Sequence, residues 1–289
     1  MKSRIILKYK LIIGVLLFIN ALLSCNVINP AESIPGYIHL DSIHLSTDYF
    51  TEGSSASKIS DAWIFVDNVY LGTYGLPCTF PVAKSGQHKI SIRAGVQANG
   101  MSDNRVAYPP YSTYDTTINL VAGTVTNILP VVNYKTGTEF KQIEDFDDGS
   151  VSLVSTSSSL APLNITQSSD PNAFENNSGY FSLDDNHPSF EVASSDTFSL
   201  PINVPVFLEL NYKCDNEFTI GIFISGGSVL QNPLVIARPT SVWKKIYVNI
   251  SELGGVTGGN VFYKIYLKGD KSSALSTTMF YFDNLKVLY

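Results

Sequence analysis

The side chains that could do chemistry in this chain are carboxylates, and their spacing gives no catalytic pattern. Asp147-Asp148 and Asp184-Asp185 are adjacent pairs. Neighbours in a strand point to opposite faces, so neither pair forms a glycosidase dyad, whose carboxyls stand about 5–9 Å apart across a cleft. The sequence holds no Gly-x-Ser-x-Gly nucleophile elbow and no His-Glu-x-x-His zinc helix. We therefore predict no enzyme; a hydrolase whose carboxylates come from distant segments is the remaining alternative.

Aromatic side chains are the other candidates for a site. Tyr108, Tyr111 and Tyr114 surround a rigid Pro-Pro turn, and exposed tyrosines can stack on a sugar or anchor a protein partner. These three are the candidate ligand-binding residues. The alternative is a loop pinned onto its own domain. Trp63 and Trp243 each adjoin an apolar strand and are predicted to lie in the core.

Composition predicts a folded, acidic protein. Of 289 residues 44% are hydrophobic and 15% charged, which is enough apolar surface for a real core. The formal net charge of −6 repels phosphates, so we exclude nucleic acid as a partner. Cys78 and Cys214 have no CxxC partner, and free buried thiols are favoured over a disulfide between them.

The elements that must position these residues are strands. Leu208 and Leu210 alternate with Glu209 and Asn211, the period of a half-buried strand. Short segments of this kind, separated by Gly, Pro, Asn and Ser, recur along the chain, and no stretch has a helical period. The pattern predicts an all-β protein of two β-sandwich domains. The strand pattern is interrupted at 136–138, and we place the domain boundary there, which gives domains at 35–138 and 139–289.

The first 25 residues have the pattern of a targeting segment. A head with four Lys/Arg precedes an apolar run at 11–23, too short to span a bilayer, and the run ends in Leu-Leu-Ser-Cys. This sequence resembles the lipobox of bacterial lipoproteins, and the resemblance implies diacylglycerol on the thiol of Cys25. Residues 1–24 are then a signal peptide and 25–34 a tether. Removing the four cations takes the net charge from −6 to −10.

Two further segments resemble β-domain families. The run Ile64–Gly72, with Gly86-Gln87-His88 after it, resembles a PEGA-type domain, which implies an Ig-like spacer or docking module at 35–138. From residue 139 the chain resembles the galactose-binding-like jelly rolls used as carbohydrate-binding modules. That resemblance rests on Asp145–Gly149, on Trp243 opening a strand, and on Phe280–Val287 closing the chain.

The jelly-roll resemblance also implies a cofactor. In that family acidic side chains of the first and last strands help to hold a structural calcium, which here implies Asp147 and Asp283. Two carboxylates with carbonyl oxygens suit Ca²⁺. Turn carboxylates that are simply solvated are the alternative.

The layout as a whole resembles envelope lipoproteins of Bacteroidetes-type bacteria. We therefore expect an outer-membrane lipoprotein, facing either the periplasm or the cell surface, that binds a glycan or another surface ligand through its second domain. The alternative is a structural accessory subunit of an outer-membrane protein complex. The expected partners are the membrane, through the lipid on Cys25, and a glycan or an outer-membrane protein.

Overall fold

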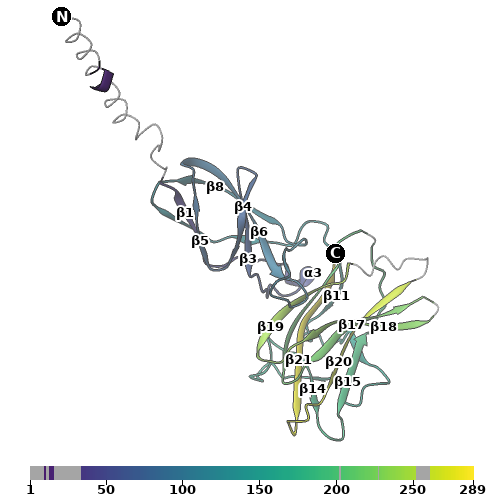
Figure 1. The fold of residues 1–289 in the computed structure, drawn as a ribbon. Coiled ribbons are helices and arrows are strands. Elements are labelled where there is room, and N and C mark those ends of the chain that lie inside the picture. Colours follow the sequence, from purple (N-terminus) through teal and green to yellow (C-terminus); the bar gives the residue numbers. More distant parts are fainter. Residues whose placement is uncertain (1–9, 11–12, 16–33, 202, 227, 252–260) are drawn as a thin grey trace, which may run out of the picture.

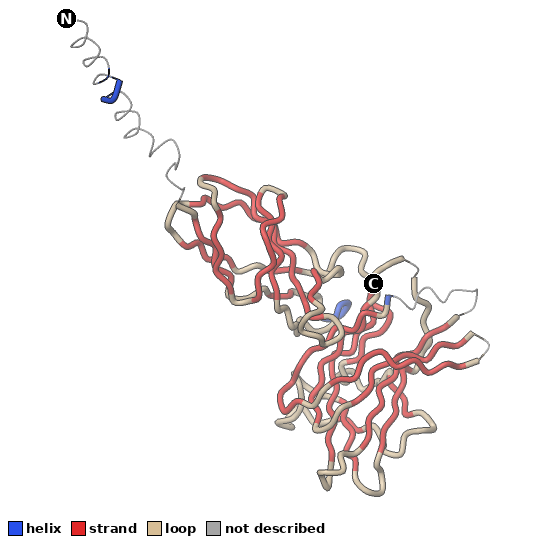
Figure 2. The backbone as a smooth tube through the Cα atoms, viewed as in Figure 1, coloured by secondary structure: helices blue, strands red, loops and turns tan. Residues whose placement is uncertain are grey.

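The computed structural model describes residues 10, 13–15, 34–201, 203–226, 228–251 and 261–289. Most of the predicted signal peptide, together with Cys25, lies outside them. Among the described residues no helix has the length and apolar character needed to cross a membrane. The described chain is almost entirely strand (Figure 2), and the predicted all-β fold class is confirmed.

The strands up to residue 132 pair with one another, and we call them the N-terminal sheets. One sheet has the order β4-β3-β6-β7 with β8 also on β6, a second the order β5-β1-β9, and β2 pairs with β10. The β3–β4 turn has φ of 51° at Asp67 and 66° at Asn68, which suits a two-residue hairpin. The elements are β1 (Gly36–Leu40), β2 (His44–Leu45), α3 (Tyr49–Glu52), β3 (Asp61–Val66), β4 (Val69–Gly75), β5 (Cys78–Val82), β6 (Gly86–Gln97), β7 (Arg105–Ala107), β8 (Thr113–Leu120), β9 (Val125–Ile128) and β10 (Val131–Val132).

The strands from residue 140 onward form two further sheets, the C-terminal sheets. The six-stranded sheet has the order β13-β14-β21-β16-β19, with β11 also on β21, and the five-stranded sheet has the order β12-β15-β20-β17-β18. The elements are β11 (Phe140–Glu144), β12 (Leu153–Ser155), β13 (Asn164–Ile165), β14 (Gly179–Leu183), β15 (Ser189–Ser194), β16 (Phe207–Cys214), β17 (Phe218–Ser225), β18 (Val229–Ala237), β19 (Thr240–Asn249), β20 (Phe262–Asp270) and β21 (Thr278–Leu288).

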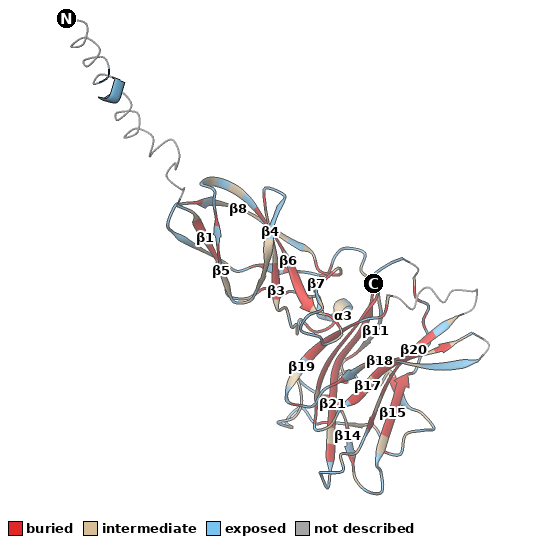
Figure 3. Ribbon diagram, viewed as in Figure 1, coloured by how far each residue is buried: buried red, intermediate tan, exposed pale blue. Residues whose placement is uncertain are grey.

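The two C-terminal sheets enclose one apolar core. Leu208 and Leu210 of the six-stranded sheet and Ile220 and Ile222 of the five-stranded sheet are all fully buried in it. Each strand thus alternates between core and outer face, as the sequence pattern predicts. Figure 3 shows the buried residues concentrated along these strands.

A bulge in β21 changes which residues face outward. Asn284 has φ of 48°, and the pairing of β21 with β16 shifts register between Glu209 and Asn211. Before the bulge the core residue is Phe282, whereas after it the core residues are Leu285 and Val287. Lys286 is thereby turned out of the sandwich core and pairs with Glu209 on the outer face of the six-stranded sheet.

That outer face contacts the N-terminal sheets. Phe207, Tyr247 and Leu288 belong to the same hydrophobic cluster as the core of the N-terminal sheets. Figure 1 shows the N-terminal sheets at one end of the molecule and the C-terminal sheets at the other, with β1 and β5 far from the contact. We call this contact the junction. No described residue of the five-stranded sheet belongs to this cluster, so the outer face of that sheet takes no part in the junction.

Candidate functional site

The candidate site is a groove of about 310 Å³ on the outer face of the five-stranded sheet. β12, β15, β17, β18 and β20 all contribute to it, so it spans the full width of the sheet. We call it the sheet groove. Its lining residues are Val154, Thr156, Ala193, Thr197, Phe223, Ser225, Val229 and Lys264.

An aromatic pair lies at the centre of this face. Phe223 pairs with Lys264 across β17 and β20, and Tyr266 lies opposite Gly221 one row along. The ring centroids of Phe223 and Tyr266 are 4.9 Å apart. A Cβ on Gly221 would overlap the Tyr266 ring, so only glycine lets this ring lie flat on the sheet. Tyr266 is buried, whereas Phe223 remains partly exposed in the groove.

A buried carboxylate beside the aromatic pair is fully engaged. Glu191 accepts hydrogen bonds from Thr156 Oγ1 at 2.6 Å and from Gln231 Nε2 at 2.9 Å, and the ammonium of Lys268 lies 3.4 Å away. Burial raises the pKa of Glu191, but these donors and the lysine charge outweigh it, and the pKa is lowered overall. Of these groups only Thr156 lines the groove, whose other polar side chains are Thr197, Ser225 and Lys264. The groove therefore combines an aromatic surface with a few polar groups, the usual composition of a small-ligand site.

The predicted tyrosine site lies at the junction instead of forming an exposed platform. Tyr108 and Tyr111 are each only 3% exposed. The Tyr108 hydroxyl donates to Glu209 at 2.8 Å, and the Tyr111 hydroxyl lies 3.3 Å from that of Tyr247. Tyr114 is half-buried in β8. The alternative of a pinned loop describes these residues better, although the loop is pinned to the C-terminal sheets as well as to its own.

Charged groups are buried at the junction. Glu209 is fully buried and its carboxylate lies 2.6 Å from the ammonium of Lys245, whose side chain is 2% exposed. Tyr134 also donates to Glu209, at 3.0 Å, and Lys245 donates to the carbonyl of Ala56 at 2.7 Å. Burial raises the pKa of Glu209, but the charges of Lys245 and Lys286 outweigh it and hold the pKa low. We call these residues the junction cluster.

Lys286 completes the contact. Its ammonium donates to the carbonyl of Ser54 at 2.6 Å and lies 5.3 Å from the centre of the Tyr134 ring. Burial, together with the nearby charge of Lys245, lowers the pKa of Lys286 to about 7. No sequence pattern indicates this role, because the residues around Lys286 have the pattern of an ordinary C-terminal strand.

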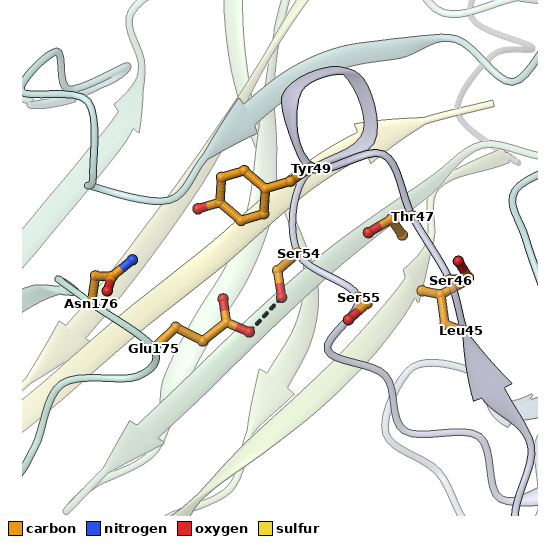
Figure 4. Close-up of a pocket in the computed structure, with 8 residues that line it drawn as sticks. All are labelled: Leu45, Ser46, Thr47, Tyr49, Ser54, Ser55, Glu175 and Asn176. Atoms are coloured by element: carbon orange, nitrogen blue, oxygen red, sulfur yellow. Dashed lines mark hydrogen bonds between the residues drawn. The ribbon is translucent and has the colours of Figure 1, made fainter.

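A second cavity, of about 500 Å³, lies beside the junction cluster. Figure 4 shows hydroxyl-bearing side chains from the chain around α3 facing Glu175 and Asn176 of the C-terminal half. Ser54 Oγ donates to Glu175 at 2.6 Å. This lining is more polar than that of the sheet groove, which makes it a poorer small-ligand site.

The predicted calcium residues come close together without forming a finished site. Asp147 accepts from the backbone N–H of Asn177 at 2.9 Å, and Asp283 accepts from Ser178 Oγ at 2.7 Å. Burial raises the pKa of Asp283 to about 8, and the charges of Glu175 and Asp147 add to the effect. Hard oxygens are therefore present, but the described residues hold no group of three or more His, Cys, Asp or Glu side chains placed for a metal. Calcium stays a prediction.

Both tryptophans depart from the expected core position. Trp63 and Trp243 are part-exposed and belong to neither hydrophobic core cluster. Trp243 packs on Phe174 with ring centroids 5.2 Å apart, and Trp63 lies 6.1 Å from the Tyr70 ring. An apolar strand next to a tryptophan did not reveal the face to which the indole points.

Cys78 and Cys214 are both free thiols, as predicted. Cys214 is buried and Cys78 is partly buried. Burial raises the pKa of both thiols, that of Cys214 to about 12, which leaves little thiolate at neutral pH.

Comparison with known proteins adds fold likeness alone. No family model matches the chain, and no curated protein sequence matches it. A carbohydrate-binding module of the β-sandwich superfamily is 14% identical, with 80% of this chain and 86% of that chain covered and a TM-score of 0.37. A family 11 carbohydrate-binding module of a Clostridium thermocellum cellulase is 16% identical over 53% of this chain and 95% of that chain, with a TM-score of 0.35. With TM-scores below 0.5, neither likeness supports a functional argument.

Proposed function

We propose that this protein is a lipid-anchored cell-envelope protein that binds a glycan in the sheet groove. The observation that carries the proposal is the lining of the groove, where the part-exposed ring of Phe223 stands beside the hydroxyls of Thr156, Thr197 and Ser225 and the ammonium of Lys264. A sugar offers an apolar ring face together with many hydroxyls, so it needs an aromatic surface and hydrogen-bonding groups at once.

The position of the groove suits a protein held at a membrane. The junction covers the six-stranded sheet, whereas the sheet groove lies on the opposite layer of the sandwich. The continuously described chain starts at Ile34, just before β1, at the end of the N-terminal sheets away from the junction (Figure 1). An anchor on Cys25 would therefore leave the N-terminal sheets between the membrane and the groove, as a spacer.

Replacing the groove aromatic tests the proposal. Removing the ring in Phe223→Ala should weaken glycan binding about tenfold, since burying a phenylalanine side chain contributes roughly 1.5–3 kcal/mol. Titration calorimetry of the detergent-purified full-length chain against neutral and acidic oligosaccharides measures the loss. Phe262→Ala is the matched control, because Phe262 is exposed at the start of β20 and does not line the groove. Absence of binding to every oligosaccharide, or an equal loss in both variants, would contradict the proposal.

The anchor has its own test. Cys25→Ser should move the protein from the membrane pellet to the soluble fraction of the envelope, because the proposed lipid is attached to the thiol that this substitution removes. Retention of the variant in the membrane would remove the lipid anchor from the proposal.

A specific surface favours the accessory-subunit alternative. On the outer face of β3 and β4, the Tyr70 ring lies 5.4 Å from Phe65 and 6.1 Å from Trp63. Tyr70 is 51% exposed and the neighbouring Val69 is 67% exposed. Tryptophan and tyrosine dominate the centres of protein interfaces. If this surface holds a protein partner, a partner recovered at near-equal amounts with wild type should be lost from Tyr70→Ala and kept by Phe223→Ala.

A further inference from the structure

A cavity of about 380 Å³ on the N-terminal sheets carries two cations. Its lining is Arg93, Ala107, Tyr108, Pro109, Tyr111, Thr113 and Lys135. This set holds an arginine and a lysine and no aspartate or glutamate, in a chain whose formal net charge is −6. We call it the cationic cavity. It lies apart from the sheet groove, with which it shares no lining residue.

Arg93 is held in place and still has donors to offer. Its guanidinium carbon lies 4.7 Å from the centre of the Phe65 ring. Stacking on an aromatic face leaves the N–H groups at the edge of the guanidinium plane available to an acceptor. Among the residues that the structure describes, Arg93 has no carboxylate within ion-pair distance, in contrast to Lys89 on the same strand, which lies 3.3 Å from Asp115.

Lys135 is likewise fixed at the cavity without a neutralising partner. Its backbone N–H donates to the carbonyl of Pro110 at 2.8 Å, and its ammonium donates to the carbonyl of Pro109 at 2.5 Å. That bond uses one of the three ammonium donors. Within the described ranges no carboxylate pairs with Lys135 either.

The remaining lining of the cavity is uncharged. The hydroxyls of Tyr108 and Tyr111 point into the junction, where Glu209 and Tyr247 engage them. The two tyrosines are each only 3% exposed, so they form the floor of the cavity with Ala107 and Pro109, while Thr113 adds a hydroxyl. Two unneutralised cations beside a hydroxyl are complementary to a ligand that carries an anionic group and hydroxyls.

We propose that the cationic cavity binds an acidic sugar, with Arg93 and Lys135 holding its carboxylate and Thr113 bonding a sugar hydroxyl above the buried Tyr108 and Tyr111. The site needs no glycan in the sheet groove, so it stands independently of the function proposed above. It is also a different use of Tyr108 and Tyr111 from the exposed platform predicted from the sequence.

The test uses monosaccharides that differ only in charge. The detergent-purified full-length chain is titrated with glucuronate and galacturonate, with glucose and galactose, and with inorganic phosphate and sulfate. The uronates should bind, more weakly as NaCl is added, and the neutral sugars should not. Arg93→Gln and Lys135→Gln should each weaken uronate binding about tenfold, the value of a charge-assisted hydrogen bond at a partly exposed site.

Lys89→Gln is the matched control, since it removes an exposed cation from the same strand without touching the cavity. It should bind uronate as wild type does. Several outcomes would overturn the proposal: no saturable binding of either uronate, equal binding of glucose and glucuronate, equal weakening in Lys89→Gln, or phosphate and sulfate binding as tightly as the uronates. The last would show an anion site to which the sugar hydroxyls contribute nothing. Unchanged thermal midpoints in the Gln variants confirm that folding is intact.

Discussion

Removing the charge of Glu209 should loosen the junction more than any single change on the molecular surface. In Glu209→Gln the shape is kept, but Lys245, 2% exposed, loses its carboxylate 2.6 Å away. The carbonyl of Ala56 and the new amide oxygen can still accept hydrogen bonds from that ammonium, but both are neutral and its negative partner is gone. Leaving one member of a buried ion pair uncompensated costs about 3–5 kcal/mol.

The assay is urea unfolding of the full-length chain in detergent, followed by circular dichroism. The matched control is Glu217→Gln, which breaks an ion pair with Arg238 at a similar distance of 3.1 Å, but with side chains 50% and 82% exposed. Its expected cost is at most about 1 kcal/mol.

A second substitution separates charge from shape. Adding Lys245→Met to Glu209→Gln removes the stranded cation and should recover most of the lost free energy of unfolding, because replacing both members of a buried pair is often close to neutral. If Glu209→Gln costs no more than Glu217→Gln, the buried cluster does not hold the two halves together and the reasoning is refuted.

The remaining predictions concern pH, packing and calcium. The pKa of Asp283 is about 8 in the folded chain against 3.8 as its ordinary value, so between these values the folded state holds an extra proton. The contribution of this group to the free energy of unfolding is therefore complete below pH 3.8. It falls by up to about 1.4 kcal/mol per pH unit as the pH rises to 8. Asp283→Asn should flatten that fall in thermal unfolding, and an unchanged slope would contradict the assignment. Calcium at pH 8 should raise the midpoint of wild type and leave Asp283→Asn unchanged; no rise in wild type would remove the calcium prediction. Gly221→Ala, which forces a methyl group into the Tyr266 ring, should cost about 1–3 kcal/mol and lower glycan affinity, whereas wild-type stability would show that the ring can move aside.

The strand pattern could be read from the sequence because it depends on local chemistry. Leu208 and Leu210 alternate with Glu209 and Asn211, and a strand must send such residues to opposite faces. In β16 the first pair is in the sandwich core and Glu209 is outside it, as predicted. The β3–β4 turn depends on local chemistry in the same way, since Asp and Asn tolerate the positive φ that Asp67 and Asn68 adopt there.

The candidate site could not be read in this way. Phe223 looks like any other member of an apolar strand, and its role depends on Lys264 and Val154, which come from distant parts of the chain. The signals that could be seen, the tyrosines around the Pro-Pro turn, pointed to a real cluster, but its partners Glu209 and Tyr247 lie more than 100 residues away. No spacing rule links residues that meet only through sheet packing.

The sequence by itself determined that this chain is all-β, acidic and built from alternating strands, because each of these depends on composition or on neighbours within a few residues. Tertiary structure alone decided which outer faces are used. Strict alternation along β21 would have sent Lys286 to the same face as Phe282, into the core; the bulge at Asn284 reverses it and places the lysine beside Glu209. Burial of a charge is tolerable only where an opposite charge and hydrogen bonds meet it. The neighbouring strand β16 supplies the charge of Glu209, and the other half of the molecule supplies the carbonyl of Ser54 as hydrogen-bond acceptor.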